Sequence, residues 1–95
     1  THLNKTGIEL YKNGRFDEAL QYFDRATLLF PRHLGLQLNR LQTLIGKAKA
    51  EPMDDALRAQ MHEQLQKVEK LLRAEPNAAQ LERFQQLRER SRQVA

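Results

Sequence analysis

The chain has 95 residues, enough for one domain with a single modest hydrophobic core. It contains no cysteine, which excludes a disulfide framework, a thiol nucleophile and a cysteine-rich zinc site. Its 16 lysines and arginines exceed its 12 aspartates and glutamates by four, and the two signs are interspersed, whereas nucleic-acid binders usually concentrate positive charge on one face.

No part of the sequence resembles a membrane-spanning helix or a signal peptide. The apolar runs are far shorter than the roughly 20 residues that a spanning helix needs. Together with the absence of cysteine, this predicts a cytoplasmic protein. Because a helical pattern begins at once from Thr1, we expect the sequence to be part of a longer chain.

Apolar residues at three- and four-residue steps predict an all-α fold with no strand. The expected helices span residues 3–13, 16–29, 33–48, 54–74 and 77–95.

Turn residues bound the first two helices. Gly14 ends the first, since glycine tolerates the left-handed conformation that often follows a helix. Asp17 and Glu18 fall in the first turn of the second, where the helix dipole favours negative charge. Pro31 ends that second helix.

The fourth helix is the longest expected. A loop at residues 47–53 precedes it, centred on Pro52, and Asp54 or Asp55 is expected to cap its start. Pro76 closes it. Its narrow apolar stripe consists of Leu57, Met61, Leu65, Val68 and Leu72.

The fifth helix is predicted to start at Asn77, with Gln80 completing a capping-box-like pattern. Residues 89–95 are mostly charged or polar, and we expect them to fray. The apolar face of this helix is expected to contain Leu81, Phe84, Leu87 and Val94.

Small residues in the first two helices predict a close antiparallel hairpin. Gly7, Ala19 and Ala26 would let the two axes approach toward the near end of the ~8–10 Å range for packed helices. Phe16 and Phe23 would fill the volume beside them.

This stretch resembles a tetratricopeptide repeat, a helix-turn-helix unit of about 34 residues. The family pattern has a bulky residue, an apolar-glycine pair and a Tyr-like residue in the first helix, then a turn glycine. An aromatic, an alanine, a second aromatic, a second alanine and a closing proline follow. The matching residues are Leu3, Thr6-Gly7, Leu10, Gly14, Phe16, Ala19, Phe23, Ala26 and Pro31. Thr6 and Leu10 are mild departures from the pattern.

The resemblance implies one domain over residues 1–95: a clear repeat at 1–34, a degenerate second repeat at 35–76 and a capping helix at 77–95. In the second repeat, Arg40 and Leu41 occupy the apolar-glycine pair, so its close-approach glycine is missing. The next closing proline comes 45 residues after Pro31, about three helical turns later than the repeat length predicts.

By the same resemblance, the chain is a non-enzymatic protein–protein interaction module, with a protein or peptide partner bound on a concave face built from first helices of successive repeats. The positions expected on that face form an apolar strip with a few amides: Asn4, Ile8, Tyr11, Leu38, Asn39, Gln42 and Ile45.

Some members of the family hold a peptide's terminal carboxylate with lysine, arginine and asparagine side chains from three repeats. Asn39 matches one such position, but Asn4 and Ile8 stand where a lysine and an asparagine are needed, and no third repeat is present. This carboxylate-binding function is therefore not expected.

Two interpretations of the strip remain open. It is either a groove for an amphipathic helix or an apolar peptide, or a surface covered by a preceding repeat or by the long fourth helix. The second interpretation makes the chain a capping or self-associating segment of a longer superhelix, and its leucine-rich style is similar to tetratricopeptide segments of bacterial response-regulator-type signalling proteins. A remote alternative is weak nucleic-acid binding through Arg83, Arg88, Arg90 and Arg92.

No catalytic, cofactor or metal site is expected. His62-Glu63 begins like the HExxH zinc motif, but Gln66 occupies the place of the second histidine. Ser91 is the only serine, which excludes a serine triad in the core.

Overall fold

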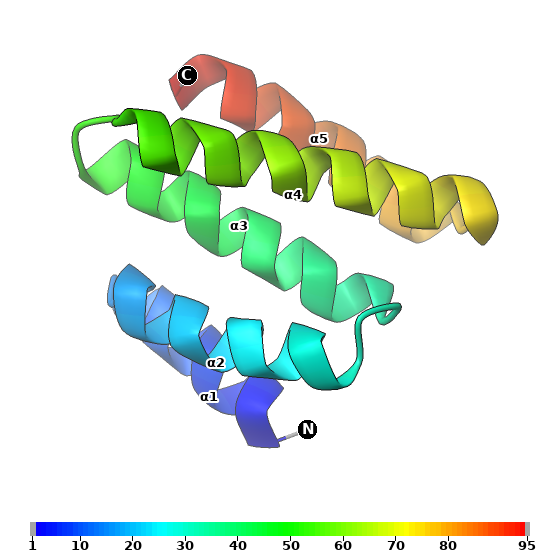
Figure 1. Ribbon diagram of the computed structural model, residues 1–95, viewed down its shortest axis with the longest axis horizontal. Coiled ribbons are helices and arrows are strands. Elements are labelled where there is room, and N and C mark those ends of the chain that lie inside the picture. The colour runs from blue at the N-terminus through cyan, green and yellow to red at the C-terminus, as the bar shows by residue number, and fades with distance from the viewer. Residues whose placement is uncertain (1, 95) are drawn as a thin grey trace.

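The computed structural model describes residues 2–94, and this part of the chain folds into five α-helices without a strand (Figure 1). The all-α fold predicted from the sequence is confirmed. The helices are α1 (His2–Lys12), α2 (Phe16–Leu29), α3 (Leu34–Ala50), α4 (Asp55–Ala74) and α5 (Ala78–Val94).

The helices form successive antiparallel hairpins around α3. This central helix packs against each of the other four, and α1 packs against α2 as α4 does against α5. In the view of Figure 1, α2 and α4 lie in front, α1 and α5 lie behind, and the two termini lie at opposite ends of the stack. The chain therefore presents two faces, one bearing α2 and α4 and the other bearing α1 and α5.

Side-chain caps fix three of the helix starts. Asp54 Oδ1 accepts a hydrogen bond from the Leu57 backbone N–H at 2.7 Å, so Asp54, one of the two aspartates expected there, is the cap of α4. Asn77 Oδ1 accepts from the Gln80 backbone N–H at 3.0 Å, as the sequence predicted. His33 caps α3 in the same way through Nδ1.

The predicted loop at 47–53 is too long, because α3 continues to Ala50. Ala48 is buried, and the Lys47 ammonium lies 2.7 Å from the Asp17 carboxylate of α2. These contacts hold the last turn of α3 in place, and only residues 51–54 connect it to α4.

The first hairpin is packed as its small residues predict. Ala19 and Ala26 are fully buried, and a methyl group added at Gly7 would lie 2.8 Å from two carbons of the Phe23 ring. Phe16 serves a different contact. It packs edge-on to Tyr11, with ring centroids 5.6 Å apart, and against the backbone of Gly46 in α3.

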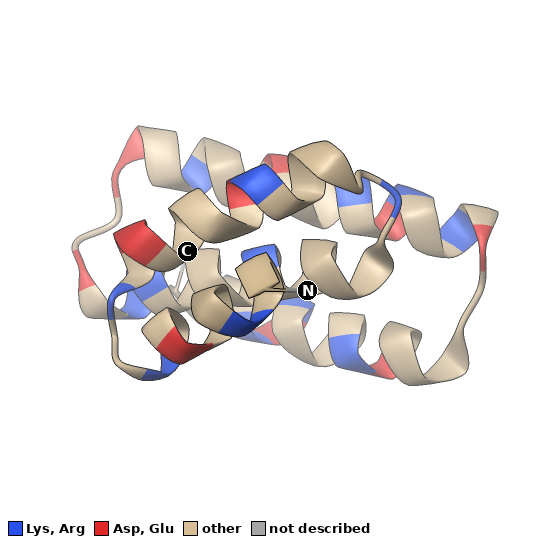
Figure 2. Ribbon diagram, turned by 90° about the horizontal axis from the view of Figure 1, so that it is seen from below, with Lys and Arg blue, Asp and Glu red and all other residues tan. Residues whose placement is uncertain are grey.

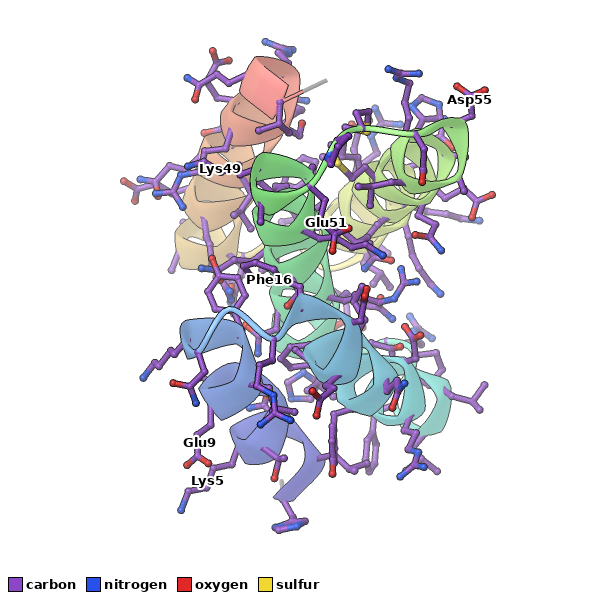
Figure 3. All side chains as sticks on the ribbon, turned by 90° about the vertical axis from the view of Figure 1, so that its left-hand side faces the viewer. Lys5, Glu9, Phe16, Lys49, Glu51 and Asp55 are labelled. Carbon is purple, nitrogen blue, oxygen red and sulfur yellow. The ribbon has the colours of Figure 1, made fainter. Side chains whose placement is uncertain are left out.

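Gly46 therefore supplies a close approach between the first hairpin and α3. A β-carbon at this position would lie 2.6 Å from the Phe16 ring. Figure 3 shows Phe16 beside the turn between α1 and α2, facing α3. Arg40 and Leu41 occupy the positions where the sequence predicted no close-approach glycine, and Gly46, five to six residues further along α3, approaches the first hairpin rather than α4.

The main core lies between α3, α4 and α5. Its buried members are Leu38, Leu41, Ile45, Val68, Leu72, Phe84 and Leu87, and a second cluster of Leu44, Ala48, Leu57 and Met61 adjoins it.

Two expectations for α5 are wrong. Residues 89–94 do not fray: they are helical, Ser91 is buried and Val94 packs against both core clusters. Leu81 is 43% exposed and does not share the buried face, because the buried positions of α5 are Phe84, Leu87 and Ser91. Residue 95 lies outside the described part of the chain.

A buried pair of glutamines joins α3 to α4. Gln64 Nε2 donates to the Gln37 carbonyl oxygen at 2.9 Å and to Gln37 Oε1 at 2.8 Å, and Gln37 Nε2 donates to the Pro31 carbonyl oxygen at 2.9 Å. Arg40 donates to Gln64 Oε1 and, at 2.7 Å, to the Asp24 carboxylate. Because buried amides are costly unless paired, this network favours one alignment of α2, α3 and α4.

Candidate protein-binding face

The face bearing α1, α3 and α5 contains the seven positions predicted to contact a partner, and the structure divides them into two groups. Leu38 and Ile45 are buried, 0% and 3% exposed, within the main core. Of the two interpretations left open for the strip, the covered one describes these two residues. The fifth helix, rather than the fourth alone, covers them, because Phe84 and Leu87 pack into the same cluster as Val68 and Leu72 of α4.

The other five predicted residues are half-buried and lie close together: Asn4, Ile8, Tyr11, Asn39 and Gln42. A cavity of about 270 Å³ opens between α1 and α3. It is lined by Ile8, Tyr11, Asn39 and Gln42, together with Lys12, Phe23 and Thr43. We call it the α1–α3 groove.

Hydrogen bonds connect the polar side chains of the α1–α3 groove. Asn39 Nδ2 donates to Asn4 Oδ1 at 2.7 Å, and Gln42 Nε2 donates to the Tyr11 hydroxyl at 3.3 Å. Each bond links α3 to α1, so the two walls of the groove are held in a fixed relation.

Arg83 of α5 completes this network, although its place in the sequence predicted only a basic stretch on the last helix. Its guanidinium donates to Asn39 Oδ1 at 2.7 Å and to Gln42 Oε1 at 2.8 Å. A signal was available, since Arg83 directly precedes Phe84 and lies one helical turn before Leu87, at the edge of the buried stripe of α5.

The charge of Arg83 is not balanced by a carboxylate. Within residues 2–94 its guanidinium donates hydrogen bonds to two neutral amides and forms no ion pair. Burial lowers the pKa of Arg83 from its ordinary value, but an arginine remains protonated at neutral pH. A partly desolvated cation therefore stands beside the α1–α3 groove, and Lys12 adds a second positive charge at its rim.

The other arginines of α5 are Arg88, Arg90 and Arg92, and each lies near acidic residues. Arg90 lines a surface cavity together with Glu82 and Glu89. Arg88 lies over the Phe84 ring and 3.8 Å from the Glu69 carboxylate, and Arg92 lies 3.4 Å from the Glu89 carboxylate. Figure 2 shows positive and negative residues alternating along the helices. This distribution does not favour the nucleic-acid alternative.

Aromatic packing supports Tyr11, which forms part of the α1 wall of the groove. Tyr11 packs edge-on to the Phe16 ring, and both rings lie against the Gly46 backbone, whereas the exposed Lys5 and Glu9 lie on the outer side of α1 (Figure 3). A fixed Tyr11 ring offers a partner an apolar surface without a large loss of side-chain entropy.

The described residues contain no group of three or more histidine, cysteine, aspartate or glutamate side chains arranged to hold a metal ion. None of the helices in residues 2–94 combines the length and the apolar character needed to cross a bilayer.

Comparison with known proteins identifies the first hairpin. No solved structure matches the chain. The family model of the tetratricopeptide repeat matches residues 3–33, which comprise nearly all of α1, all of α2 and the turn that follows. Such repeats are typically non-catalytic and bind other proteins. Residues 3–33 thus match one tetratricopeptide repeat, and a repeat of this kind implies a protein–protein interaction module.

Proposed function

We propose that the chain binds a peptide segment of another protein in the α1–α3 groove, with an apolar side chain of the peptide in the groove and a carboxylate against Arg83. In this proposal α3 and α4 form a degenerate second repeat of residues 35–76, and α5 is the capping helix that also supplies the charged contact.

The observation that carries the proposal is the hydrogen-bonding state of Arg83. A guanidinium has five N–H donors, and the amide oxygens of Asn39 and Gln42 engage only part of them. These amides hold the group in position but do not neutralise it. A carboxylate would form charge-assisted hydrogen bonds, which contribute about 1.5–3 kcal/mol each.

The apolar part of the groove supports the same conclusion. Ile8, Tyr11 and Phe23 line it beside the amides and Lys12, and Arg83 is held next to it by its hydrogen bonds to Asn39 and Gln42. Apolar surface and positive charge therefore lie close together. This combination fits a short segment that contains an acidic residue next to a large apolar one.

A random 12-residue peptide library displayed on phage would test the proposal. We expect panning on the wild-type chain to enrich sequences with an acidic and a large apolar residue. Binding of the enriched peptides should weaken at least about tenfold in Arg83→Met, which keeps the aliphatic bulk and removes the charge. Ile8→Asp should weaken it similarly.

Leu28→Asp is the matched control, because Leu28 is 82% exposed on α2, away from the groove, and its replacement should leave binding unchanged. Circular dichroism would verify that each variant is folded. Enriched peptides that lack acidic residues, or that bind Arg83→Met as tightly as wild type, would contradict the proposal.

A further inference from the structure

A second groove lies on the opposite face, between α2 and α4. Both helices pack against α3, but within residues 2–94 they make no close backbone contact with each other. In Figure 1 both helices lie in front, and α3 lies between them and farther from the viewer. Two cavities of about 490 and 580 Å³ occupy this space, and they adjoin because both are lined by Pro31, Glu63 and Lys67. We call them together the α2–α4 groove.

The α2–α4 groove adjoins the most exposed apolar side chains of the molecule. Leu28 lines it and is 82% exposed, and Leu29 and Phe30 beside it are 64% and 48% exposed. On the α4 side, Leu71 and Ala74 line the second cavity. A run of three large apolar residues at one helix end is costly in water and is typical of an interaction surface.

The wall formed by α4 carries positive charge that the fold leaves unpaired. Lys67 and Lys70 both line the groove, and neither forms an ion pair with any of the described residues. The acidic residue on the α2 side, Asp24, is already neutralised by Arg40 at 2.7 Å. Glu63 is the remaining carboxylate of that wall, so the unpaired lysines outnumber it.

We propose that the α2–α4 groove docks an amphipathic helix of another protein, with an apolar stripe against Leu28 and Leu71 and acidic residues facing Lys67 and Lys70. Lys67 and Lys70 are three residues apart on α4, so acidic residues spaced three or four apart on the ligand helix can meet both. This surface is independent of the α1–α3 groove and would allow the chain to hold two partners at once.

The test uses two synthetic 18-residue amphipathic helical peptides that share one leucine stripe. One peptide carries glutamates beside the stripe and the other carries lysines. Nuclear magnetic resonance titration of the isotope-labelled chain with the glutamate peptide should shift the backbone signals around Leu28, Lys67, Lys70 and Leu71. Binding should weaken at least about tenfold in Leu28→Asp, because burying a leucine side chain against a ligand strengthens binding by at least about that factor.

Charge reversal gives the sharper result. The double variant Lys67→Glu/Lys70→Glu should lose affinity for the glutamate peptide and gain affinity for the lysine peptide, and both effects should diminish at high salt. Ile8→Asp, which alters the α1–α3 groove, should bind the glutamate peptide as wild type does.

Several outcomes would overturn the proposal. Equal affinity of the wild-type chain for the two peptides would show that the ligand need not be acidic. Shifts confined to α1 and α5 would place the peptide on the other face. Concentration-dependent self-association in sedimentation that Leu28→Asp abolishes would assign the groove to a second copy of the chain.

Discussion

Replacing Gly7 by alanine tests the packing of the first hairpin. The added β-carbon would lie 2.8 Å from Phe23 Cε1 and Cζ and 3.1 Å from Cε2, so it would meet the face of the ring. Phe23 is 1% exposed, and it borders open space only where it lines the α1–α3 groove, so most of its ring is surrounded by other groups. Overpacking of a well-packed core costs about 1–3 kcal/mol, and we expect the upper half of that range here.

A gain in helix propensity offsets part of this cost. Alanine is favoured over glycine within a helix by about 1 kcal/mol. The net destabilisation of Gly7→Ala should therefore be about 1–2 kcal/mol, which lowers the melting temperature of a domain of this size by about 4–16 °C. Urea and thermal denaturation followed by far-ultraviolet circular dichroism measure both quantities.

Gly35→Ala is the matched control. Its β-carbon would meet only the exposed His33 side chain, at 3.1 Å from Cε1, and a small shift of this side chain relieves the contact at some cost to its hydrogen bond with the Leu36 N–H. The gain in helix propensity offsets that cost. We expect Gly35→Ala to be as stable as wild type or slightly more stable. If Gly7→Ala is equally well tolerated, the close approach of α1 to Phe23 is not the constraint described above.

A double-mutant cycle separates the clash from other effects. Phe23→Leu should remove the part of the ring that the added methyl group meets, so Gly7→Ala should cost less in that background. The coupling energy should exceed about 0.5 kcal/mol, which is larger than the usual departure from additivity for independent sites. Additive effects would contradict a direct contact.

Three further predictions concern other contacts. The hydrogen bond to Asp17 raises the pKa of Lys47, burial lowers it by less, and nearby negative charges add smaller increases. Because Asp17 favours the charged form of Lys47, Asp17→Asn should destabilise the fold by about 0.2–1 kcal/mol at neutral pH. This stabilisation is complete below the unfolded pKa of lysine, about 10.4, and is lost as the pH rises through the raised pKa of Lys47, so urea midpoints of the two proteins should converge in strong alkali. Gln64→Leu removes the amide that donates to the two buried oxygens of Gln37, so the free energy of unfolding should fall by about 1–3 kcal/mol. An unchanged urea midpoint would show that the glutamine pair does not stabilise the fold. Deleting residues 89–95 should lower the melting temperature by several degrees because it removes buried contacts, whereas a frayed tail would be lost without effect.

The candidate site could be predicted only in part. The resemblance to a tetratricopeptide repeat placed Asn4, Ile8, Tyr11, Asn39 and Gln42 on one face, and these residues do lie together. The resemblance could not distinguish them from Leu38 and Ile45, because Leu38 and Ile45 recur on α3 at the same helical spacing as Asn39 and Gln42. Which of them is covered depends on where α5 packs, and nothing within α3 specifies that.

The sequence by itself determined the local structure. Glycine, proline and capping residues set the helix boundaries to within a few residues, and the order of small and aromatic residues identified the repeat, since these features act over one or two turns of chain. Only the tertiary structure decided the surfaces. The packing of α5 on α3 brings Arg83 to Asn39 across 44 residues, and the separation of α2 from α4 leaves Leu28 exposed. Such relations arise from contacts between elements distant in the chain, which no local pattern encodes.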